Sequence, residues 1–370
     1  MIRKIAFALT LVLGTQPTFA HDSHAGSRPA HVTAMSDAAN SFLATLSDDQ
    51  RKTASRPFDD DTARTNWNYL PSAMVKRDGI PLGELDASQR IAVHAVFGAA
   101  LSSQGYGKAA QIMWLDDILH EDVKAGIARL TAKGESTADM QKWLETRDSQ
   151  KYWLNFFGEP GTSRWGWMIS GHHLAANFTV VDGRVAFTPL FLGASPQTIQ
   201  SGRYAGRRTL QFEIDRAFSF VASLTDAQRS TVIQSKDIPA KMFADKGRKN
   251  DAGTYIGLPA SRLDEAQRIK LMSLIREYVG NVSDEAAAVQ MASIKKDGMK
   301  ALHFAWWGAI DDSNKRFMYR IHGPSVLIEF VREAGEKGAP GNHVHSIVRD
   351  PRNDYGEDWL KRHYSEQHQP

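Results

Sequence analysis

Alternating apolar and polar positions, interrupted by turn residues, predict antiparallel strands in the middle and at the end of the chain. Asp182-Gly183 separates two such runs, and this dipeptide supplies the positive φ angles of a tight hairpin turn. Gly323-Pro324 separates a second pair of runs. The predicted strands cover residues 172–181, 184–192, 317–322, 326–331 and 343–348.

Apolar residues at helical spacing precede each group of strands. These patterns predict helices over residues 91–102, 109–130, 138–145, 263–279 and 284–294. A helical set followed by hairpins is typical of an α+β fold, in which helices pack on an antiparallel sheet.

Two segments of the chain repeat each other. Residues 39–51 (ANSFLATLSDDQR) and 217–229 (AFSFVASLTDAQR) share eight identities in thirteen positions at an offset of 178. Residues 85–90 (LDASQR) and 263–268 (LDEAQR) recur at the same offset. We therefore expect an internally duplicated fold with a pseudo-twofold relation. Its first half covers residues 35–205, its second half covers residues 206–370 with the His-x-His strand, and both form one domain.

The repeated segments carry a helix-capping pattern. In each copy a Ser, Thr or Asp stands three residues before a glutamine, which is the spacing of a capping box. We interpret these positions as structural helix starts without chemistry; they are Ser47, Asp86, Thr225 and Asp264.

The first twenty residues predict a secretory signal peptide. Arg3 and Lys4 precede an apolar stretch, and Thr18-Phe19-Ala20 ends in small residues suited to cleavage. Residues 21–34 are polar and predict a mobile N-terminal arm. No later segment is long and apolar enough for a membrane span. We expect a periplasmic or secreted protein.

Composition narrows the possible chemistry. The formal net charge of the 370-residue chain is +3, which argues against nucleic acid as a partner. The chain has 13 histidines and no cysteine, so a metal would have to be held by nitrogen and oxygen. No dinucleotide or P-loop fingerprint is present, which argues against a nucleotide cofactor.

Several histidines lie where they can share a divalent ion. His343 and His345 are two apart on a predicted strand, so both side chains face the same way. His322 stands at a strand end beside a turn. We expect these residues and one of the adjacent His172 and His173 to form a site for zinc, copper or iron.

The neighbours of the adjacent pair favour His173. On a strand, His172 would share its face with apolar residues, whereas His173 would share its face with Asn177 and Thr179. We therefore assign His173 to the site and His172 to the core or to a supporting hydrogen bond. A bulge would exchange the two faces.

Three further polar residues are candidates for catalysis. Glu329 on a predicted strand is a candidate ligand or general base. Arg349 is a candidate substrate clamp, or an ion-pair partner of Asp354. Asp350 precedes a proline and also suits turn chemistry.

Three sequence blocks together resemble the domain of unknown function 3500 family. They are W-G-W-x-x-x-G-H-H-L-x-x-N-F-T-V-V at 165–181, R-I-H-G-P-x-x-L-I-E-F at 320–330 and N-H-V-H-S-I-V-R-D-P-x-N-D-Y-G at 342–356. The resemblance implies that the blocks belong to one fold covering most of the chain. It implies no settled activity, substrate or ligand set.

The candidate residues favour an exported, metal-dependent enzyme, hydrolytic or oxidative, acting on a small-molecule substrate. A metal-binding or metal-handling protein without turnover is one alternative. The other is a binding module whose ligand cleft is lined by Trp165, Trp167, Trp306 and Trp307. The oligomeric state stays open.

Overall fold

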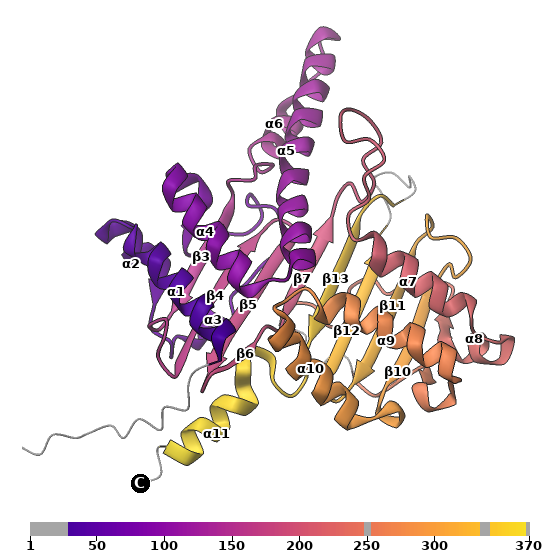
Figure 1. The fold of residues 1–370 in the computed structure, drawn as a ribbon. Coiled ribbons are helices and arrows are strands. Elements are labelled where there is room, and N and C mark those ends of the chain that lie inside the picture. Colours follow the sequence, from indigo (N-terminus) through magenta and orange to yellow (C-terminus); the bar gives the residue numbers. More distant parts are fainter. Residues whose placement is uncertain (1–28, 248–252, 334–340, 368–370) are drawn as a thin grey trace, which may run out of the picture.

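A large, mostly antiparallel sheet runs through the whole molecule (Figure 1). The computed structural model describes residues 29–247, 253–333 and 341–367. Thirteen strands join in the order β1-β3-β4-β5-β7-β13-β12-β11-β10-β8, with β2 on β3, β6 on β5 and β9 on β10. The strands are β1 (Ser55–Arg56), β2 (Ile80–Pro81), β3 (Tyr152–Phe157), β4 (Arg164–Gly171), β5 (Leu174–Val181), β6 (Arg184–Ala186), β7 (Leu190–Ala194), β8 (Ile233–Ser235), β9 (Leu258–Pro259), β10 (His303–Gly308), β11 (Phe317–Gly323), β12 (Val326–Arg332) and β13 (Val344–Arg349).

Helices cover one face of this sheet, so the predicted α+β class is confirmed. In Figure 1 helices α1, α4 and α5 lie over the strands of the first half, and α7, α9 and α10 over those of the second. The α-helices are α1 (Ala30–Ala44), α2 (Asp48–Ala54), α3 (Asp61–Arg64), α4 (Ala87–Ala100), α5 (Ser103–Ala132), α6 (Ala138–Leu144), α7 (Gln211–Ala222), α8 (Asp226–Val232), α9 (Glu265–Val279), α10 (Asp284–Asp297) and α11 (Glu357–Gln367).

The opposite face of the sheet packs against two long segments and the C-terminal helix. Phe58 and Trp67 from one segment and Met242 and Ala244 from the other join a second buried cluster with side chains from this face of the sheet. Leu360 of α11 belongs to the same cluster. The sheet is therefore buried on both faces, and none of the described helices is long and apolar enough to cross a membrane.

All four predicted capping boxes are present. Ser47, Asp86, Thr225 and Asp264 cap α2, α4, α8 and α9. The capping glutamines have a further role, because they meet in pairs: Gln50 and Gln89 exchange amide hydrogen bonds, and Gln228 and Gln267 do the same. The two halves thus repeat the same local contacts at the offset of the sequence repeat, whereas descent of both from one duplicated unit stays a prediction.

The N-terminal segments differ from expectation where the structure describes them. Residues 30–34, assigned to a mobile arm, form the start of α1. The physical reason is burial, because Val32 and Met35 pack into the main core. The predicted signal peptide and residues 21–28 lie outside the described part of the chain.

The four tryptophans proposed to line a ligand cleft are core residues instead. Trp165, Trp167 and Trp306 are at most 1% exposed, and Trp307 is 6% exposed. Trp167 stacks between Phe97 and Phe178. These rings stabilise the fold by burying apolar area, and the prediction of a cleft lined by them is wrong.

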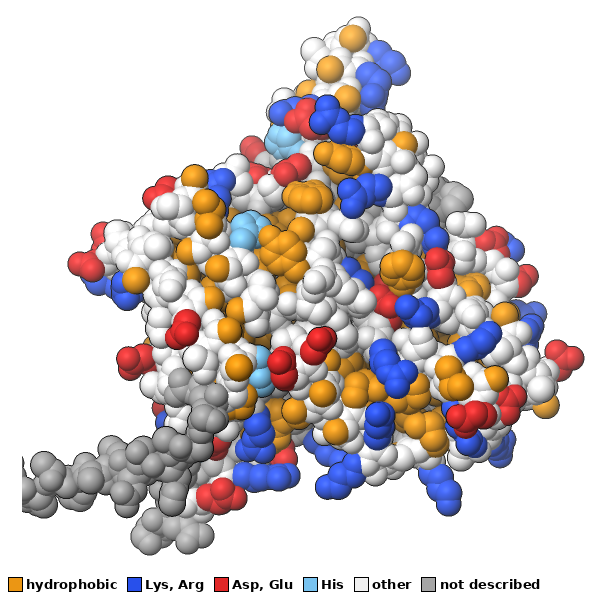
Figure 2. Space-filling model, viewed as in Figure 1, with side chains coloured by type: hydrophobic (Ala, Val, Ile, Leu, Met, Phe, Trp, Pro, Cys, Tyr) orange, Lys and Arg blue, Asp and Glu red, His pale blue; other side chains and the backbone are white. Residues whose placement is uncertain are grey.

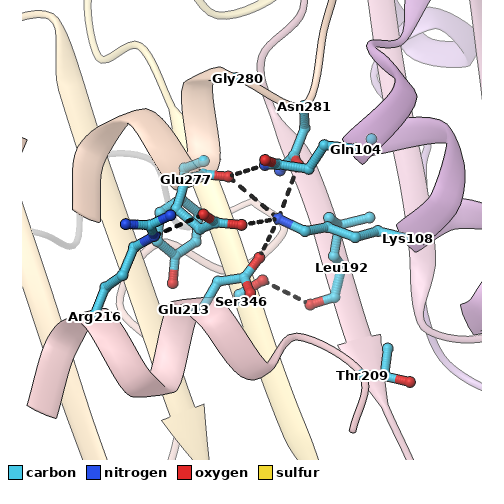
Figure 3. Close-up of polar contacts among 12 residues, drawn as sticks. Gln104, Lys108, Leu192, Thr209, Glu213, Arg216, Glu277, Gly280, Asn281 and Ser346 are labelled. Atoms are coloured by element: carbon cyan, nitrogen blue, oxygen red, sulfur yellow. Dashed lines mark hydrogen bonds and ion pairs between the residues drawn. The ribbon is translucent and has the colours of Figure 1, made fainter. Parts of the chain in front are cut away.

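A buried cluster of charges joins the helices of the two halves (Figure 3). The Lys108 ammonium of α5 lies 2.7 Å from a carboxylate oxygen of Glu213 on α7 and 2.7 Å from one of Glu277 on α9. It also donates to the Asn281 side chain, and Arg216 pairs with the second oxygen of Glu277. Burial raises the pKa of Glu213, opposed by Lys108. Two cations thus balance two carboxylates at this junction.

Removing the cation from this cluster should destabilise the fold strongly. Lys108→Met keeps an apolar stem but removes the cation that Glu213 shares with Glu277, while Arg216 still pairs with Glu277. Loss of one partner of a buried pair costs about 3–5 kcal/mol. Unfolding in urea measures the change. Arg208→Met is the control, because its pair with Asp215 is partly exposed and should contribute less than about 1 kcal/mol. Equal losses for both variants would contradict the assignment.

Candidate metal site

Three histidines converge where the two halves of the sheet meet. His173, His343 and His345 each place one ring nitrogen within 4.8 Å of the others. The Nε2 atoms of His173 and His343 are 2.9 Å apart, although the residues are 170 positions apart in sequence. Among the described residues, these three side chains form a group that could together hold a metal ion.

A hairpin turn presents His173. β4 ends at Gly171 and β5 begins at Leu174, so both His172 and His173 lie in the turn between them. The prediction that they alternate on a strand is therefore wrong. His173 has φ 62°, in the left-handed region that residues with a Cβ rarely adopt. Its backbone is held by bonds from its N–H to the Tyr69 carbonyl and from the Gly193 N–H to its own carbonyl.

The other two histidines flank the start of β13. His345 lies opposite Gly193 of β7 and opposite Val331 of β12. His343 precedes the strand, and its carbonyl accepts a bond from the Glu333 N–H. Because alternate residues share a face, both rings point to the same side of the sheet, as the His-x-His spacing predicts.

Gly193 leaves the room that the rings occupy. A Cβ built at this position would lie 3.0 Å from a ring carbon of His173 and 3.0 Å from a ring carbon of His345. Any larger residue would displace at least one imidazole. Gly193 therefore determines the space available to the rings of His173 and His345.

A carboxylate orients two of the rings. The Glu333 carboxylate lies 3.4 Å from Nδ1 of His343 and 3.2 Å from Nδ1 of His345. Burial alone would raise the pKa of Glu333, but hydrogen bonding to His345 and nearby positive charge lower it to about 2. A carboxylate at Nδ1 leaves Nε2 free to bind a metal, which is the common arrangement around metal-bound histidines.

Burial favours the neutral form of His173 and His343. It holds the pKa of His173 well below its usual value, with the adjacent His172 adding to the effect. Burial and the neighbouring His345 lower the pKa of His343 to about 3. Neutral imidazole is the form that binds metal ions.

The residues fit a tetrahedral ion such as zinc. Two nitrogens at about 2.0–2.1 Å from zinc are about 3.3 Å apart in this geometry, so the observed 2.9 Å needs only a small opening. The buried Nε2 of His345 has no hydrogen-bond partner within the part of the chain that the structure describes. A shared ion would satisfy all three rings.

A second set of contacts fixes the turn that carries His173. Nδ1 of His172 donates to Asp116 of α5 across 2.6 Å, and Nη1 of Arg147 lies 2.7 Å from Nε2 of the same ring. The Tyr152 hydroxyl lies 2.9 Å from the Asp116 carboxylate and donates to the His172 carbonyl. His172 therefore supports the site from one side, while its ring stacks on that of His173.

The three rings open onto a cavity of about 690 Å³. His343 and Glu333 are 30% and 41% exposed along their side chains, so solvent reaches the site from their side. Residues on several elements form the walls, including Met74, Leu119, Asp122, Trp143, Arg147 and Pro196.

The structure places His322 elsewhere. It lies opposite His303 on β10, and its ring contacts that of Tyr255 edge-on. Burial, with smaller effects of Arg320 and His303, lowers its pKa to about 4. The convergence expected of His322 with the other three histidines is absent because its strand end belongs to the far side of the second half of the sheet.

Glu329 and Arg349 hold a loop against the sheet. Glu329 is fully buried, pairs with Arg320 at 2.8 Å and accepts a bond from the Ala244 N–H. Arg349 pairs with Asp354 at 2.7 Å, which is one of the two roles predicted for it from the sequence. It also donates to the Ala244 carbonyl. These contacts make both residues parts of the fold rather than of the histidine cluster.

Asp350 forms the turn that its position before a proline indicates. Its carboxylate accepts bonds from the N–H groups of Arg352 and Asn353 and from the Gln290 amide. Burial raises its pKa to about 6. Asp350 is not among the contacts of His173, His343 and His345 described above.

Sequence reasoning missed Glu333 and Asp116. Glu333 directly follows β12, whose last residue Arg332 pairs with Val344, and only the register of β12 with β13 sets it beside the histidines. Asp116 sits in a correctly predicted helix, with nothing in the sequence to connect it to His172.

The fold and site define a mixed α/β protein with a candidate three-histidine metal site between two halves of one sheet. The chain belongs to the DUF3500 family of proteins of unknown function, whose model matches residues 28–357. No curated protein and no solved structure matched the chain.

The backbone at His173 generates a testable prediction. With φ at 62°, His173→Ala should be less stable than His173→Gly by about 1–2 kcal/mol, because Cβ clashes with the backbone in the left-handed region. His173→Asn should be closer to the glycine variant. Urea unfolding of the metal-free protein gives the values.

The same pair of substitutions at His322 is the control. This residue lies within β11, where glycine weakens a strand, so His322→Ala should be the more stable of the two. An alanine variant at position 173 that matches or exceeds the glycine variant would show that the turn is not strained.

Proposed function

We propose that this protein is a metal-dependent hydrolase with a single ion, zinc by preference, held by His173, His343 and His345. The observation that carries the proposal is the convergence of three imidazoles on one point at the wall of an open cavity. Three protein ligands with a remaining position for water is the typical arrangement of catalytic zinc, whereas structural zinc is closed by four.

The ligand set favours hydrolysis over oxidation. Non-haem iron oxygenases typically use two histidines and one carboxylate as ligands. Here the carboxylate of Glu333 lies beside the Nδ1 atoms of two histidines and orients them instead. A bound zinc ion supplies Lewis acidity and lowers the pKa of its water towards 7. The elements of water would divide between the two products of an ester, amide or phosphoester.

The residues of the cavity suit a substrate with an apolar part. Met74, Leu119 and Trp143 supply apolar walls, and Arg147 places a cation near the histidines. We also propose export to the periplasm or the exterior, on the basis of the predicted signal peptide.

Metal content tests the ligand assignment. Protein purified without a polyhistidine tag should carry about one ion per chain by elemental analysis. The double variant His343→Ala/His345→Ala should lose the ion, because one imidazole alone binds weakly. His322→Ala is the matched control and should retain it. Retention of the ion by the double variant would move the site elsewhere, and copper or iron in place of zinc would contradict the choice of metal.

Access to the ion separates an enzyme from a metal-handling protein. In the cobalt-substituted protein, azide should change the visible absorption spectrum, since an open coordination position takes up a small anion. An unchanged spectrum at high azide concentration would indicate a closed site, and it would favour metal handling without turnover over catalysis.

A further inference from the structure

A groove follows α5 towards the metal cavity. Two cavities, of about 560 and 470 Å³, share Gln111, Trp114 and Arg207 in their walls. The second of them lies between α5 and the loop of residues 195–209. The cavity at the histidines also lies between α5 and this loop, further along the helix. Leu119 and Asp122 of α5 line one side of it, and Ser195 and Pro196 of the loop line the other. Asp122 borders both, so the three cavities follow one another.

The groove has the length of a chain-like ligand. Its α5 residues extend from Tyr106 to Asp122, which is about 24 Å along a helix axis. Figure 1 shows α5 crossing the sheet and extending beyond its edge, with the loop after β7 beside it. Figure 2 shows hydrophobic side chains gathered on the surface along the helix, interleaved with charged ones.

Aromatic rings are exposed along this path. Trp114 is 53% exposed and Tyr204 is 43% exposed, and both line the cavity of about 470 Å³. Trp143, 42% exposed, stands at the metal cavity. Large aromatic residues are usually buried or in contact with a partner, so exposed rings in a row indicate a binding surface.

The polar groups between the rings are mixed in sign and type. Arg207 and Gln111 offer donors, while Asp117 and Glu121 offer carboxylate acceptors. Such walls do not select a strongly charged polymer. They suit a ligand that is neutral, has flat apolar faces for the rings and carries many hydroxyl groups.

We propose that the groove binds the chain of a neutral, ester-substituted oligosaccharide and leads its ester group to the metal site. This proposal names the substrate class and therefore rests on the proposed function. A peptide bound as an added strand is less suited, because that mode of recognition uses the free backbone groups of a sheet edge. Here one wall is α5, a helix whose backbone groups are bonded internally, so recognition must come from side chains.

Glycines on the helices provide a blocking variant and its control. A Cβ at Gly107, which lines the groove, and a Cβ at Gly98, an exposed residue of α4 that lines none of the cavities described above, each meet no atom within 4 Å. Both tolerate a larger residue without a clash at Cβ. Gly107→Leu would project a side chain into the groove, whereas Gly98→Leu changes the surface outside it.

Binding of defined sugars tests the proposal. The probes are the linear hexasaccharides of β-1,4-glucose, β-1,4-xylose, β-1,4-mannose and α-1,4-glucose, with their disaccharides, measured by titration calorimetry. At least one hexasaccharide should bind at least tenfold more tightly than its disaccharide. Trp114→Ala and Gly107→Leu should weaken that binding at least tenfold, and Gly98→Leu should leave it unchanged.

The result is independent of the metal assignment. The double variant His343→Ala/His345→Ala should keep its sugar affinity within about threefold even if it loses the ion, so failure of one proposal does not imply failure of the other. The sugar proposal is overturned if no hexasaccharide binds, if Trp114→Ala binds as tightly as the unchanged protein, or if an unstructured hexapeptide or a polyanion binds more tightly than every sugar.

Discussion

Everything at the candidate site depends on the pairing of β7 with β13. Among the described strands, this ladder joins the first half of the sheet to the second, and it sets Gly193 opposite His345. Gly193 also donates its N–H to the carbonyl of His173. One glycine thus lies between two potential ligands from distant parts of the chain. A shift of the ladder by one residue would turn His345 to the other face of the sheet.

Helix α5 also stabilises the junction between the two halves of the sheet, through contacts with both of them. Lys108 and Asp116 are eight residues apart, so they lie on similar faces of the helix. Lys108 binds the carboxylates of the second half, and Asp116 binds the turn of the first half that carries the histidines. The buried cluster is costly to desolvate, but it fixes where the helix lies relative to both halves. The position of His173 therefore depends on contacts made well outside the cavity.

Local signals in the sequence predicted much of the fold, and long-range geometry decided the rest. Capping boxes and the Asp182-Gly183 hairpin depend on neighbouring residues, so α2, α4, α8, α9 and the strands around that turn were predictable. The His-x-His spacing predicted that His343 and His345 share a face. His172 and His173 were misplaced because β5 begins at Leu174, two residues later than the strand predicted over 172–181. His322, Glu333 and Asp116 needed the strand order and the helix packing, which no local pattern contains.

The distance in sequence between His173 and His343 gives the site a mechanical meaning. An ion bound by both would close a loop of 170 residues in a chain that has no cysteine for a disulfide. Such a cross-link restricts the denatured chain far more than the native one, and the restriction grows with the logarithm of the loop length. Coordination would then act as a reversible cross-link between the halves. Binding of the ion would stabilise the folded protein, and removal of the ion by a chelator would reverse that stabilisation.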